Sequence, residues 1–351
     1  DRRPNVVVVL IDDMGYGDLS CHGSPHWKTP HLDALHASSV RLTDFHVAPM
    51  CSPTRGQLLT GLDAMRNGGT IVASSRMMVR SDAPMLPAHL AAAGYATGQF
   101  GKWHLGENPP HRPQDRGFEE TLWFPLQEIS SLSDHWGADY FDPVFRGRDD
   151  QRTKFSGYCT DVLFDQAIGW MGRMQAAGRP FFCYLPLNVV HGPQWAPAEL
   201  RDEVARRFPQ LSAGQVGYLA MLANADANMG KLEAFLRKSG MRENTIVVFL
   251  SDNGGYALVG RYNAQMRDGK SRLAEGGHRV PCFLRWPQGG VGGDGRGRDV
   301  DGLTQVQDLT PTLLEWCGAR ALPGPPLDGI SLAGALAGRG AIPDQIGRAH
   351  V

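Results

Sequence analysis

Two short apolar runs, each followed directly by acidic residues, constrain the fold of this chain most strongly. The first covers Asn5–Ile11 (NVVVVLI), and the second covers residues 245–250 (TIVVFL). Uninterrupted β-branched runs of this length are typical of strands that are buried on both faces of a parallel sheet. Weaker runs at residues 96–100, 180–187 and 282–286 predict further strands.

Helical patterns separate these predicted strands. They cover residues 161–177, 212–238 and 308–317, and Gly240 is a suitable C-cap for the second. Strands that alternate with helices predict right-handed βαβ crossovers. We therefore expect an α/β fold with a mostly parallel central sheet flanked by helices on both faces. In such sheets, ligands bind at the carboxyl ends of the strands.

The composition excludes several classes of protein. The chain has 35 basic and 36 acidic residues and a formal net charge of −1, so its bulk charge favours neither nucleic acid nor an anionic membrane as a partner. Its longest apolar run, residues 6–11, is far too short to cross a membrane. The six cysteines include no CxxC pair. The glycine-rich residues 288–298 do not open a helix, so we interpret them as a surface loop rather than a phosphate cradle.

Oxygen-bearing side chains follow both of the strongest predicted strands. Asp12 and Asp13 follow the first strand, and Asp252 and Asn253 follow the second. Four oxygen donors without a histidine or cysteine among them suit Ca²⁺ or Mg²⁺ better than zinc. Either pair alone is better explained as the cap of a following helix. The occurrence of both pairs favours a cation site.

Histidines offer a competing metal site. Five of them are closely spaced near the N-terminus, at His22, His26, His31, His36 and His46. The chain contains no HExxH motif, and the strand-end carboxylates fit a hard cation better. We therefore disfavour a histidine site on sequence grounds.

A second reactive segment begins at Cys51 (CSPTRGQLLTG). Pro53 suits the first position of a helix with Ser52 as its N-cap, and Gly61 suits its end. Cys51 would then lie at a helix N-terminus, where free N–H groups favour an anion. Arg55 follows by four positions and can turn back toward the same anion, although the spacing is too short for a cysteine-phosphatase loop.

The segment at Cys51 resembles the signature of the type I sulfatases, the formylglycine-dependent family related to alkaline phosphatase. Other segments resemble further motifs of this family in the same order, across roughly residues 5–335. These are residues 9–17 (VLIDDMGYG), 29–33 (TPHLD), 100–106 (FGKWHLG), 191–193 (HGP), 251–255 (SDNGG) and 269–281 (GKSRLAEGGHRVP).

The resemblance implies a modified nucleophile and a metal. A formylglycine-generating maturation enzyme would oxidise Cys51 to formylglycine, whose aldehyde hydrates to a geminal diol. One diol oxygen would attack sulfur, and the other would later expel sulfate. The implied Ca²⁺ ligands are Asp12, Asp13, Asp252, Asn253 and residue 51.

The resemblance also implies roles for further side chains. Arg55 would hold the diol, and Lys102, His104 and Lys270 would bind the sulfate oxygens. The resulting excess of positive charge suits a sulfate monoester and the charge that develops on its bridging oxygen. Taken singly, Lys102 and His104 fit an edge strand that faces water, and Lys270 fits a solvated surface residue.

Three residues are expected to move protons. Asp252 would take the proton from the attacking hydroxyl, His191 would protonate the leaving alcohol, and His104 would be the base for elimination. A lone histidine before Gly-Pro, such as His191, is otherwise a common loop residue.

The resemblance predicts a sulfuric ester hydrolase that acts on a sulfated small molecule or glycan, with no nucleic acid or membrane partner. A phosphonate monoester or phosphodiester hydrolase, or a non-catalytic binder of sulfated glycans, remains an alternative. Asn253 argues against the two-zinc phosphatases, which carry Asp-His at this place. We expect residues 112–118 and 134–142 at the pocket rim, where Trp136 and Tyr140 would stack on a sugar or aryl ring unless they serve in packing.

The resemblance also suggests the domain organisation. Residues 1–335 would form the catalytic α/β domain, and residues 336–351 would be the truncated start of a C-terminal region whose subdomain is largely missing. Residues 346–351 (IGRAHV) match the translation of a common sequencing adapter, which suggests an artefact. No signal peptide is present, but the family suggests a periplasmic or secreted, extracytoplasmic location.

Overall fold

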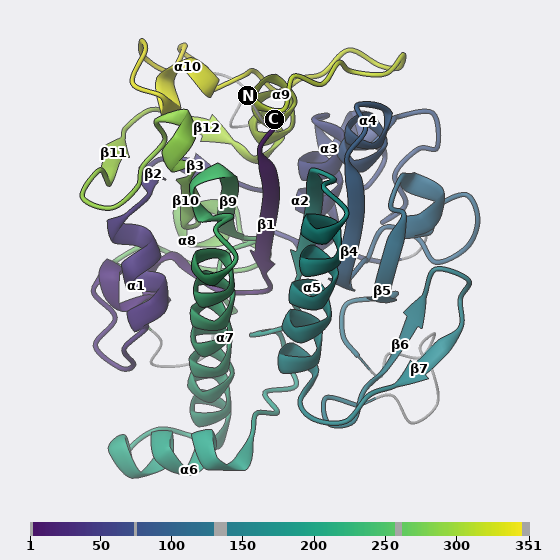
Figure 1. Cartoon of the computed structure of the whole chain (residues 1–351). Coiled ribbons are helices and arrows are strands. Elements are labelled where there is room, and N and C mark those ends of the chain that lie inside the picture. Colours follow the sequence, from purple (N-terminus) through teal and green to yellow (C-terminus); the bar gives the residue numbers. More distant parts are fainter. Residues whose placement is uncertain (1–2, 74–75, 130–138, 257–261, 346–351) are drawn as a thin grey trace.

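The computed structural model describes residues 3–73, 76–129, 139–256 and 262–345, which form an α/β structure around a ten-stranded sheet (Figure 1). The strands are β1 (Asn5–Ile11), β2 (Val40–Leu42), β3 (Phe45–His46), β4 (Ala96–Lys102), β5 (Glu120–Phe124), β6 (Val144–Gly147), β7 (Arg152–Lys154), β8 (Phe181–Pro186), β9 (Thr245–Ser251), β10 (Cys282–Arg285), β11 (Arg298–Val300) and β12 (Thr304–Gln305).

The helices vary widely in length. They are α1 (Pro30–Ala37), α2 (Cys51–Thr60), α3 (Ala64–Asn67), α4 (Leu86–Ala92), α5 (Cys159–Ala176), α6 (Ala198–Arg207), α7 (Ala213–Lys238), α8 (Glu275–His278), α9 (Leu309–Trp316) and α10 (Ala333–Leu336). Short 3₁₀ helices are η1 (Tyr16–Asp18), η2 (Ser20–His22), η3 (Pro113–Arg116), η4 (Arg242–Asn244), η5 (Pro287–Gly289) and η6 (Val306–Asp308).

The predicted α/β fold is confirmed, and its parallel strands occupy the centre of the sheet. The strand order is β11-β2-β10-β9-β1-β8-β4-β5-β6-β7. The strands β9, β1, β8, β4 and β5 are parallel to one another, whereas β10 pairs with β9, and β6 with β5, in the antiparallel sense. Each of the five predicted strands and three predicted long helices is present, with ends shifted by a few residues at most.

The register of β1 and β9 brings the acidic strand ends together. Asn5 lies opposite Thr245, and Ile11 lies opposite Ser251. The Asp252 backbone N–H donates a hydrogen bond to the Ile11 carbonyl (3.1 Å). Both strands therefore end at the same level at the edge of the sheet where ligand sites form in this class of fold.

The side chains of β1 alternate between two core layers. Val7 and Val9 pack in one hydrophobic cluster with residues of α5 and α7, which cover one face of the sheet in Figure 1. Val6 and Val8 pack in a second cluster with residues of α2 and α9. Burial on both faces explains why this strand contains no polar residue between Asn5 and its acidic end.

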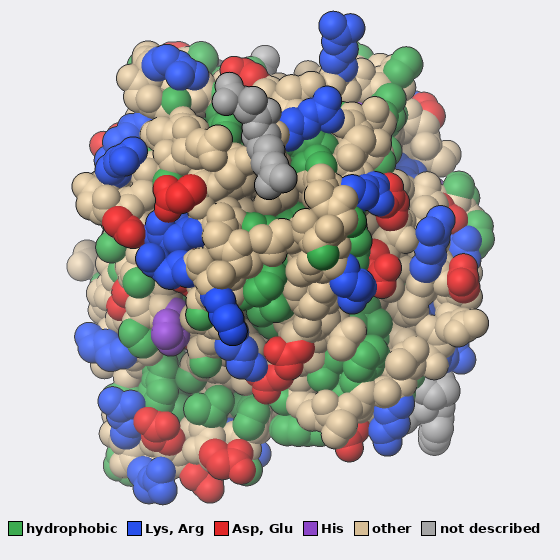
Figure 2. All heavy atoms as spheres, in the orientation of Figure 1, with side chains coloured by type: hydrophobic (Ala, Val, Ile, Leu, Met, Phe, Trp, Pro, Cys, Tyr) green, Lys and Arg blue, Asp and Glu red, His purple; other side chains and the backbone are tan. Residues whose placement is uncertain are grey.

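The surface agrees with the near-zero net charge. Basic and acidic side chains are interspersed over the face drawn in Figure 2. Within the described residues, no helix has both the length and the apolar character that a membrane crossing requires. Residues 346–351, which we suspected of being an artefact, lie outside the described part of the chain. The predicted domain division at residue 335 stays a prediction.

Candidate active site at the ends of β1 and β9

Four buried side chains converge at the carboxyl ends of β1 and β9. One potential ligand atom from each of Asp12, Asp13, Cys51 and Asp252 lies within 4.8 Å of all the others. All four residues are at most 1% exposed. Cys51 begins α2, and its Sγ atom is 3.5 Å from Asp12 Oδ1. Asp13 has a left-handed backbone (φ 64°), which a non-glycine residue adopts only where surrounding contacts hold it.

Each carboxylate of this group pairs with its own cation. Arg55 donates from Nε (3.1 Å) and from an Nη atom (2.7 Å) to Asp252 Oδ2. Lys102 Nζ is 2.6 Å from Asp12 Oδ2. The three carboxylates are thereby compensated, because the third ion pair joins Lys270 to Asp13.

Lys270 links the nucleophile position to the carboxylates. Its Nζ atom is 2.6 and 2.8 Å from the two carboxylate oxygens of Asp13 and 3.4 Å from Cys51 Sγ. Burial would lower the pKa of Lys270, but the surrounding carboxylates, led by Asp13, outweigh burial and raise it. Lys270 is therefore a cation at neutral pH and not the solvated surface residue of the alternative interpretation.

The edge-strand interpretation of Lys102 is wrong. Lys102 is the last residue of β4, which lies inside the sheet between β8 and β5. Its side chain is fully buried. A buried ammonium group requires a partner, and Asp12 supplies it.

The buried charges shift the pKa values of the group. Burial raises the pKa of Asp12, and the nearby Asp252 raises it further, to about 6. Burial also opposes ionisation of Asp252, but Arg55 and the two lysines outweigh it and hold the pKa of Asp252 below its usual range. Burial, followed by the charge of Asp252, holds the pKa of the Cys51 thiol well above its ordinary value. Cys51 is therefore a neutral thiol, which is a poor nucleophile.

Asn253 carries a buried oxygen without a hydrogen-bond donor. Its Nδ2 atom donates to Asp13 Oδ1 (2.8 Å) and to the Gly254 carbonyl (2.8 Å). Its Oδ1 atom has no hydrogen-bond partner among the described residues. An orphaned amide oxygen beside three carboxylates fits a hard cation, which prefers oxygen ligands.

Helix α2 starts earlier than the sequence pattern predicts. Met50, with an extended backbone, is the N-cap, and the helix begins at Cys51 rather than at Pro53. Proline is tolerated there because the first helical N–H groups have no partner within the helix. Ser52, the predicted cap, instead donates its hydroxyl to the His104 carbonyl (2.8 Å). The predicted helix end at Gly61 is confirmed.

The two predicted catalytic histidines have different environments. His104 is fully buried, and its Nε2 atom is 3.0 Å from the Val72 carbonyl. Its Nδ1 atom has no hydrogen-bond partner within the described residues. Burial, together with Lys102 and Arg55, holds the pKa of His104 well below its ordinary value. His104 is therefore a neutral imidazole with a lone pair on Nδ1.

His191 is more accessible and lies against Asp13. Its side chain is 16% exposed, with Nε2 at 3.8 Å from Asp13 Oδ2. Its Nδ1 atom is 2.7 Å from the Gly192 carbonyl and 3.9 Å from Glu128 Oε2. Glu128 was not found from the sequence, because no motif surrounds it and it is distant from His191 along the chain.

A buried support of the Asp13 turn was also missed. The Tyr218 hydroxyl, on α7, hydrogen-bonds Asp18 Oδ2 and is 3.4 Å from the Asp13 carbonyl. Asp18 Oδ2 also accepts from the Gly15 N–H (2.7 Å). In the sequence, Tyr218 is indistinguishable from an aromatic core residue of an amphipathic helix.

The predicted rim segments contribute more to packing than expected. Tyr140 is fully buried, and its ring packs edge-on against Trp195. Phe118 lies in the core, and Arg116 is buried and donates to the Ala83 carbonyl (2.6 Å). Trp136 lies outside the described residues. Packing is therefore the role of Tyr140.

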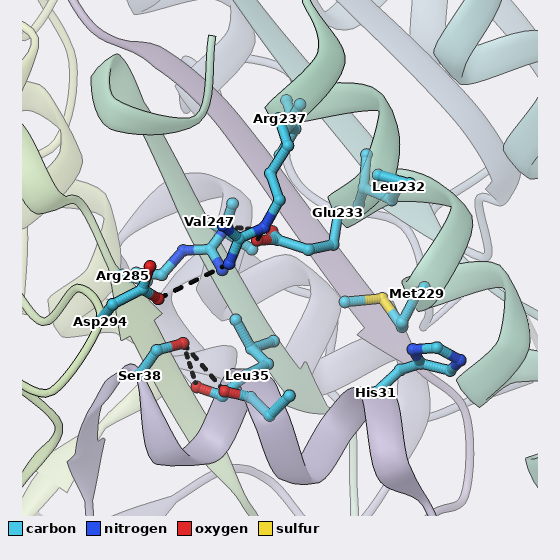
Figure 3. Close-up of a pocket in the computed structure, with 14 residues that line it drawn as sticks. His31, Leu35, Ser38, Met229, Leu232, Glu233, Arg237, Val247, Arg285 and Asp294 are labelled. Atoms are coloured by element: carbon cyan, nitrogen blue, oxygen red, sulfur yellow. Dashed lines mark hydrogen bonds and ion pairs between the residues drawn. The ribbon is translucent and has the colours of Figure 1, made fainter. Parts of the chain in front are cut away.

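A cavity of about 300 Å³ beside α1 and α7 contains none of the predicted site residues (Figure 3). Its charged groups already pair with one another: Glu233 and Arg285 point toward each other at 2.6 Å. We therefore place the candidate site at the carboxylate group and not in this cavity.

Breaking the Arg55–Asp252 pair is expected to destabilise the protein. We predict that Arg55→Met lowers the free energy of unfolding by about 3–5 kcal/mol, because it leaves a buried carboxylate without its cation. Urea denaturation in a calcium chelator would measure the change. Arg173→Met, which removes an exposed ion pair with Glu120, is the matched control and should change stability by about 1 kcal/mol or less. Equal effects of the two substitutions would contradict this account.

Comparison with known proteins agrees with the arrangement of the site. The sequence profile of the Sulfatase family matches residues 4–319. Arylsulfatase A of Homo sapiens is 32% identical over an alignment that covers 98% of this chain and 70% of that protein. N-acetylgalactosamine-6-sulfatase of Canis lupus familiaris is 32% identical over 96% of this chain and 66% of its own length.

A solved structure extends the comparison to the fold. The crystal structure of Ps i-CgsB in complex with k-i-k-neocarrahexaose has a TM-score of 0.87 and 28% sequence identity to this chain, covering 97% of this chain and 77% of that one. The chain spans about two thirds of the length of arylsulfatase A and of N-acetylgalactosamine-6-sulfatase, the two curated relatives. The profile match, the relatives and the fold agree, and this protein belongs to the sulfatase family of sulfuric ester hydrolases, with an alkaline phosphatase-like fold.

Proposed function

We propose that this chain hydrolyses sulfate monoesters with a formylglycine derived from Cys51 and with one bound Ca²⁺. The observation that carries the proposal is the position of Cys51, whose sulfur lies among three buried carboxylates and beside the ammonium group of Lys270. Membership of the sulfatase family supports the reaction class. The modification of Cys51 and the bound Ca²⁺ go beyond what family membership shows.

The residues present fit Ca²⁺. Asp12, Asp13, Asp252 and the orphaned Oδ1 of Asn253 supply oxygen donors, and residue 51 would supply another after modification. Bound Ca²⁺ would polarise oxygen atoms at this position and offset the negative charge of the carboxylates. The site, with three carboxylates, three cationic side chains and Ca²⁺, would then have a net positive charge that attracts an anionic substrate.

Modification of Cys51 explains a sulfur atom among hard ligands. A thiol is a poor partner for Ca²⁺, and burial keeps this one protonated. Formylglycine would supply a hydrated aldehyde, an oxygen nucleophile that also suits the metal. Because Cys51 is 1% exposed in the folded chain, the maturation enzyme would have to reach it before folding is complete.

The lysines are suited to bind the sulfate group. The ammonium group of Lys102 pairs with Asp12, and that of Lys270 pairs with Asp13 in the same cluster. Their positive charge would stabilise the oxygens of the sulfate in the ground state and the charge that develops in the transition state. Arg55 stays positively charged at neutral pH, so it would not transfer protons but would orient residue 51 and Asp252.

The histidines are suited to proton transfer at different atoms. His191 donates from Nδ1 to the Gly192 carbonyl, so the proton for the leaving alcohol would come from Nε2 of the doubly protonated ring. His104 donates from Nε2 to the Val72 carbonyl, which leaves the Nδ1 lone pair to accept a proton during elimination. Donation from His104 to a sulfate oxygen would require Nδ1 to be protonated first.

The contacts of Asp252 give less support to its predicted role as a base. Asp252 Oδ2 accepts two hydrogen bonds from Arg55, and the pKa of Asp252 lies below its usual range. A carboxylate stabilised in this way takes up a proton poorly. We propose that Asp252 is chiefly a metal ligand and the anchor of Arg55.

We propose a sulfated carbohydrate as the substrate. One named relative is an N-acetylgalactosamine-6-sulfatase, and the structure of Ps i-CgsB contains k-i-k-neocarrahexaose. Both names point to carbohydrates in proteins that resemble this chain. An extracytoplasmic location, which would suit such a substrate, likewise remains a proposal.

The reaction and the modification can be tested together. Protein produced together with a formylglycine-generating enzyme should hydrolyse nitrophenyl sulfate or a defined sulfated sugar, and mass analysis of the peptide that contains residue 51 should show the aldehyde. Faster turnover of an aryl phosphodiester or phosphonate would favour the alternative hydrolase. Unmodified Cys51 with no turnover would favour a non-catalytic binder of sulfated glycans.

Loss of either proposed substrate contact should slow turnover strongly. We predict that Lys102→Ala and His191→Ala each reduce kcat by about 10²–10³-fold, as is typical when one contact to developing charge is lost. Lys154→Ala, at an exposed position of β7, is the control and should leave kcat unchanged. Circular dichroism would verify folding of each variant, and a loss below about tenfold in both would contradict the assigned roles.

Calcium should stabilise the protein through the carboxylate group. At 100 times its Kd, Ca²⁺ is expected to raise the free energy of unfolding by about 2.7 kcal/mol. Asp13→Asn should abolish this increase, whereas Asp165→Asn, an exposed change on α5, should retain it. Denaturation curves with Ca²⁺ and with a chelator measure the effect. The same Ca²⁺ response in Asp13→Asn as in the parent would rule out this metal site.

A further inference from the structure

Two histidines outside the proposed site lie in direct contact. His46 ends β3, and His278 ends α8. Their Nδ1 atoms are 2.8 Å apart, although the residues are separated by 232 positions in the sequence. The Val47 N–H donates to the His278 carbonyl (2.9 Å), so the backbone fixes both residues. The contact is therefore built into the fold.

The hydrogen bonds on the far side of each ring define where its proton lies. His46 Nε2 is 2.9 Å from Asp44 Oδ1, and His278 Nε2 is 3.1 Å from the Leu273 carbonyl. A carboxylate and a carbonyl accept hydrogen bonds, so each Nε2 carries a proton. The Nδ1 atom of each neutral ring then carries a lone pair.

When both rings are neutral and protonated on Nε2, two lone pairs face each other across 2.8 Å. This contact is repulsive unless a positive species lies between the nitrogens, either a shared proton or a metal ion. A third donor is near, since a carboxylate oxygen of Glu275 lies within 4.8 Å of an imidazole nitrogen of both His46 and His278. Two imidazoles and a carboxylate form a ligand set that suits zinc rather than calcium.

We propose that His46, His278 and Glu275 bind a Zn²⁺ ion. Tetrahedral zinc places two imidazole nitrogens about 3.3 Å apart, so the rings would separate by about 0.5 Å to admit the ion. Glu275 is exposed and ion-paired with Arg279 at 3.2 Å, and it can turn toward the ion. Asp44 would hold the His46 ring in place, an arrangement common around zinc.

The fourth ligand position would face a cavity. His46 and His278 line a cavity of about 460 Å³, together with Gln57 of α2 and the largely exposed Leu273. A water molecule or a ligand from solution can therefore reach the ion. This cavity is distinct from the one in Figure 3, whose lining includes neither histidine.

The ion would fasten two segments that serve the proposed active site. His46 lies five positions before Cys51, and His278 lies eight positions after Lys270. The Ser271 N–H donates to the Pro49 carbonyl (2.8 Å), so these segments already run together beside the site. Zinc would add a crosslink between them and hold Lys270 in place relative to residue 51.

Metal binding at a second group of potential ligands must be distinguished from binding at His46 and His278. Cys21, His22 and His36 also offer atoms within 4.8 Å of one another. Burial, together with Asp33, raises the pKa of Cys21 far above its ordinary value, which disfavours the thiolate that zinc requires. Any metal bound there would persist when His46 is replaced, so the test rests on the difference between variants.

Metal binding can be measured without reference to catalysis. The full chain would be stripped of metal, saturated with Ca²⁺ to occupy the carboxylate site, and titrated with ZnCl₂ or CoCl₂. We expect the parent to bind one more equivalent of Zn²⁺ than His46→Gln or His278→Gln. His26→Gln, a histidine that packs against Phe208, is the matched control and should bind as the parent does.

A partial variant separates metal binding from folding. Asp44→Asn keeps all three proposed ligands, and we expect it to weaken Zn²⁺ binding about 10–100-fold without loss of the site. The visible absorption of bound Co²⁺ in the parent reports nitrogen and oxygen ligands even if a histidine variant fails to fold. Equal Zn²⁺ stoichiometry in the parent and His46→Gln, or no binding by the parent, would overturn the proposal and leave a shared proton between the rings.

Discussion

Three carboxylates lie almost without solvent exposure at the ends of two adjacent strands, and the rest of the site depends on their compensation. Unpaired, Asp12, Asp13 and Asp252 would each cost several kcal/mol to bury. Lys102 and Arg55 reach them from β4 and α2, and Lys270 reaches them from a distant part of the chain. Each of these segments is thereby drawn to the same point, which is also where Cys51 lies.

The fold makes this concentration of charge possible. Parallel pairing of β1 with β9 brings two acidic strand ends to one level, and the apolar interior of both strands keeps water away from them. The start of α2 adds Cys51 at the same level, and Arg55 follows it by four positions in the same helix. The same low-polarity surroundings that make the unpaired carboxylates costly also strengthen their attraction for a cation or for the lysines.

Much of this arrangement is visible in the sequence, for identifiable physical reasons. The Asn5–Ile11 run has no polar residue within it because β1 is buried on both faces, and its acidic end marks the edge of the sheet. The exposed strand β7 and the polar helix α6 lack such a pattern, and they were not predicted. The buried position of Lys102 was decided only by the strand order, which local sequence does not encode.

The contacts that could not be predicted from the sequence are those between segments that are far apart along the chain. Glu128 beside His191, Tyr218 beneath the Asp13 turn, and the pairing of His46 with His278 all join residues far apart along the chain. Their residue types are unremarkable in isolation. The predicted N-cap of α2 was wrong for a different reason. The Ser52 hydroxyl donates to the His104 carbonyl, and Met50 is the N-cap instead.

Anomalous diffraction from crystals grown with Ca²⁺ tests the central claim most directly. The account predicts one strong anomalous peak coordinated by Asp12, Asp13, Asp252 and Asn253, in contact with residue 51. A map with no peak at the ends of β1 and β9, from crystals in which these side chains are well ordered, would contradict it.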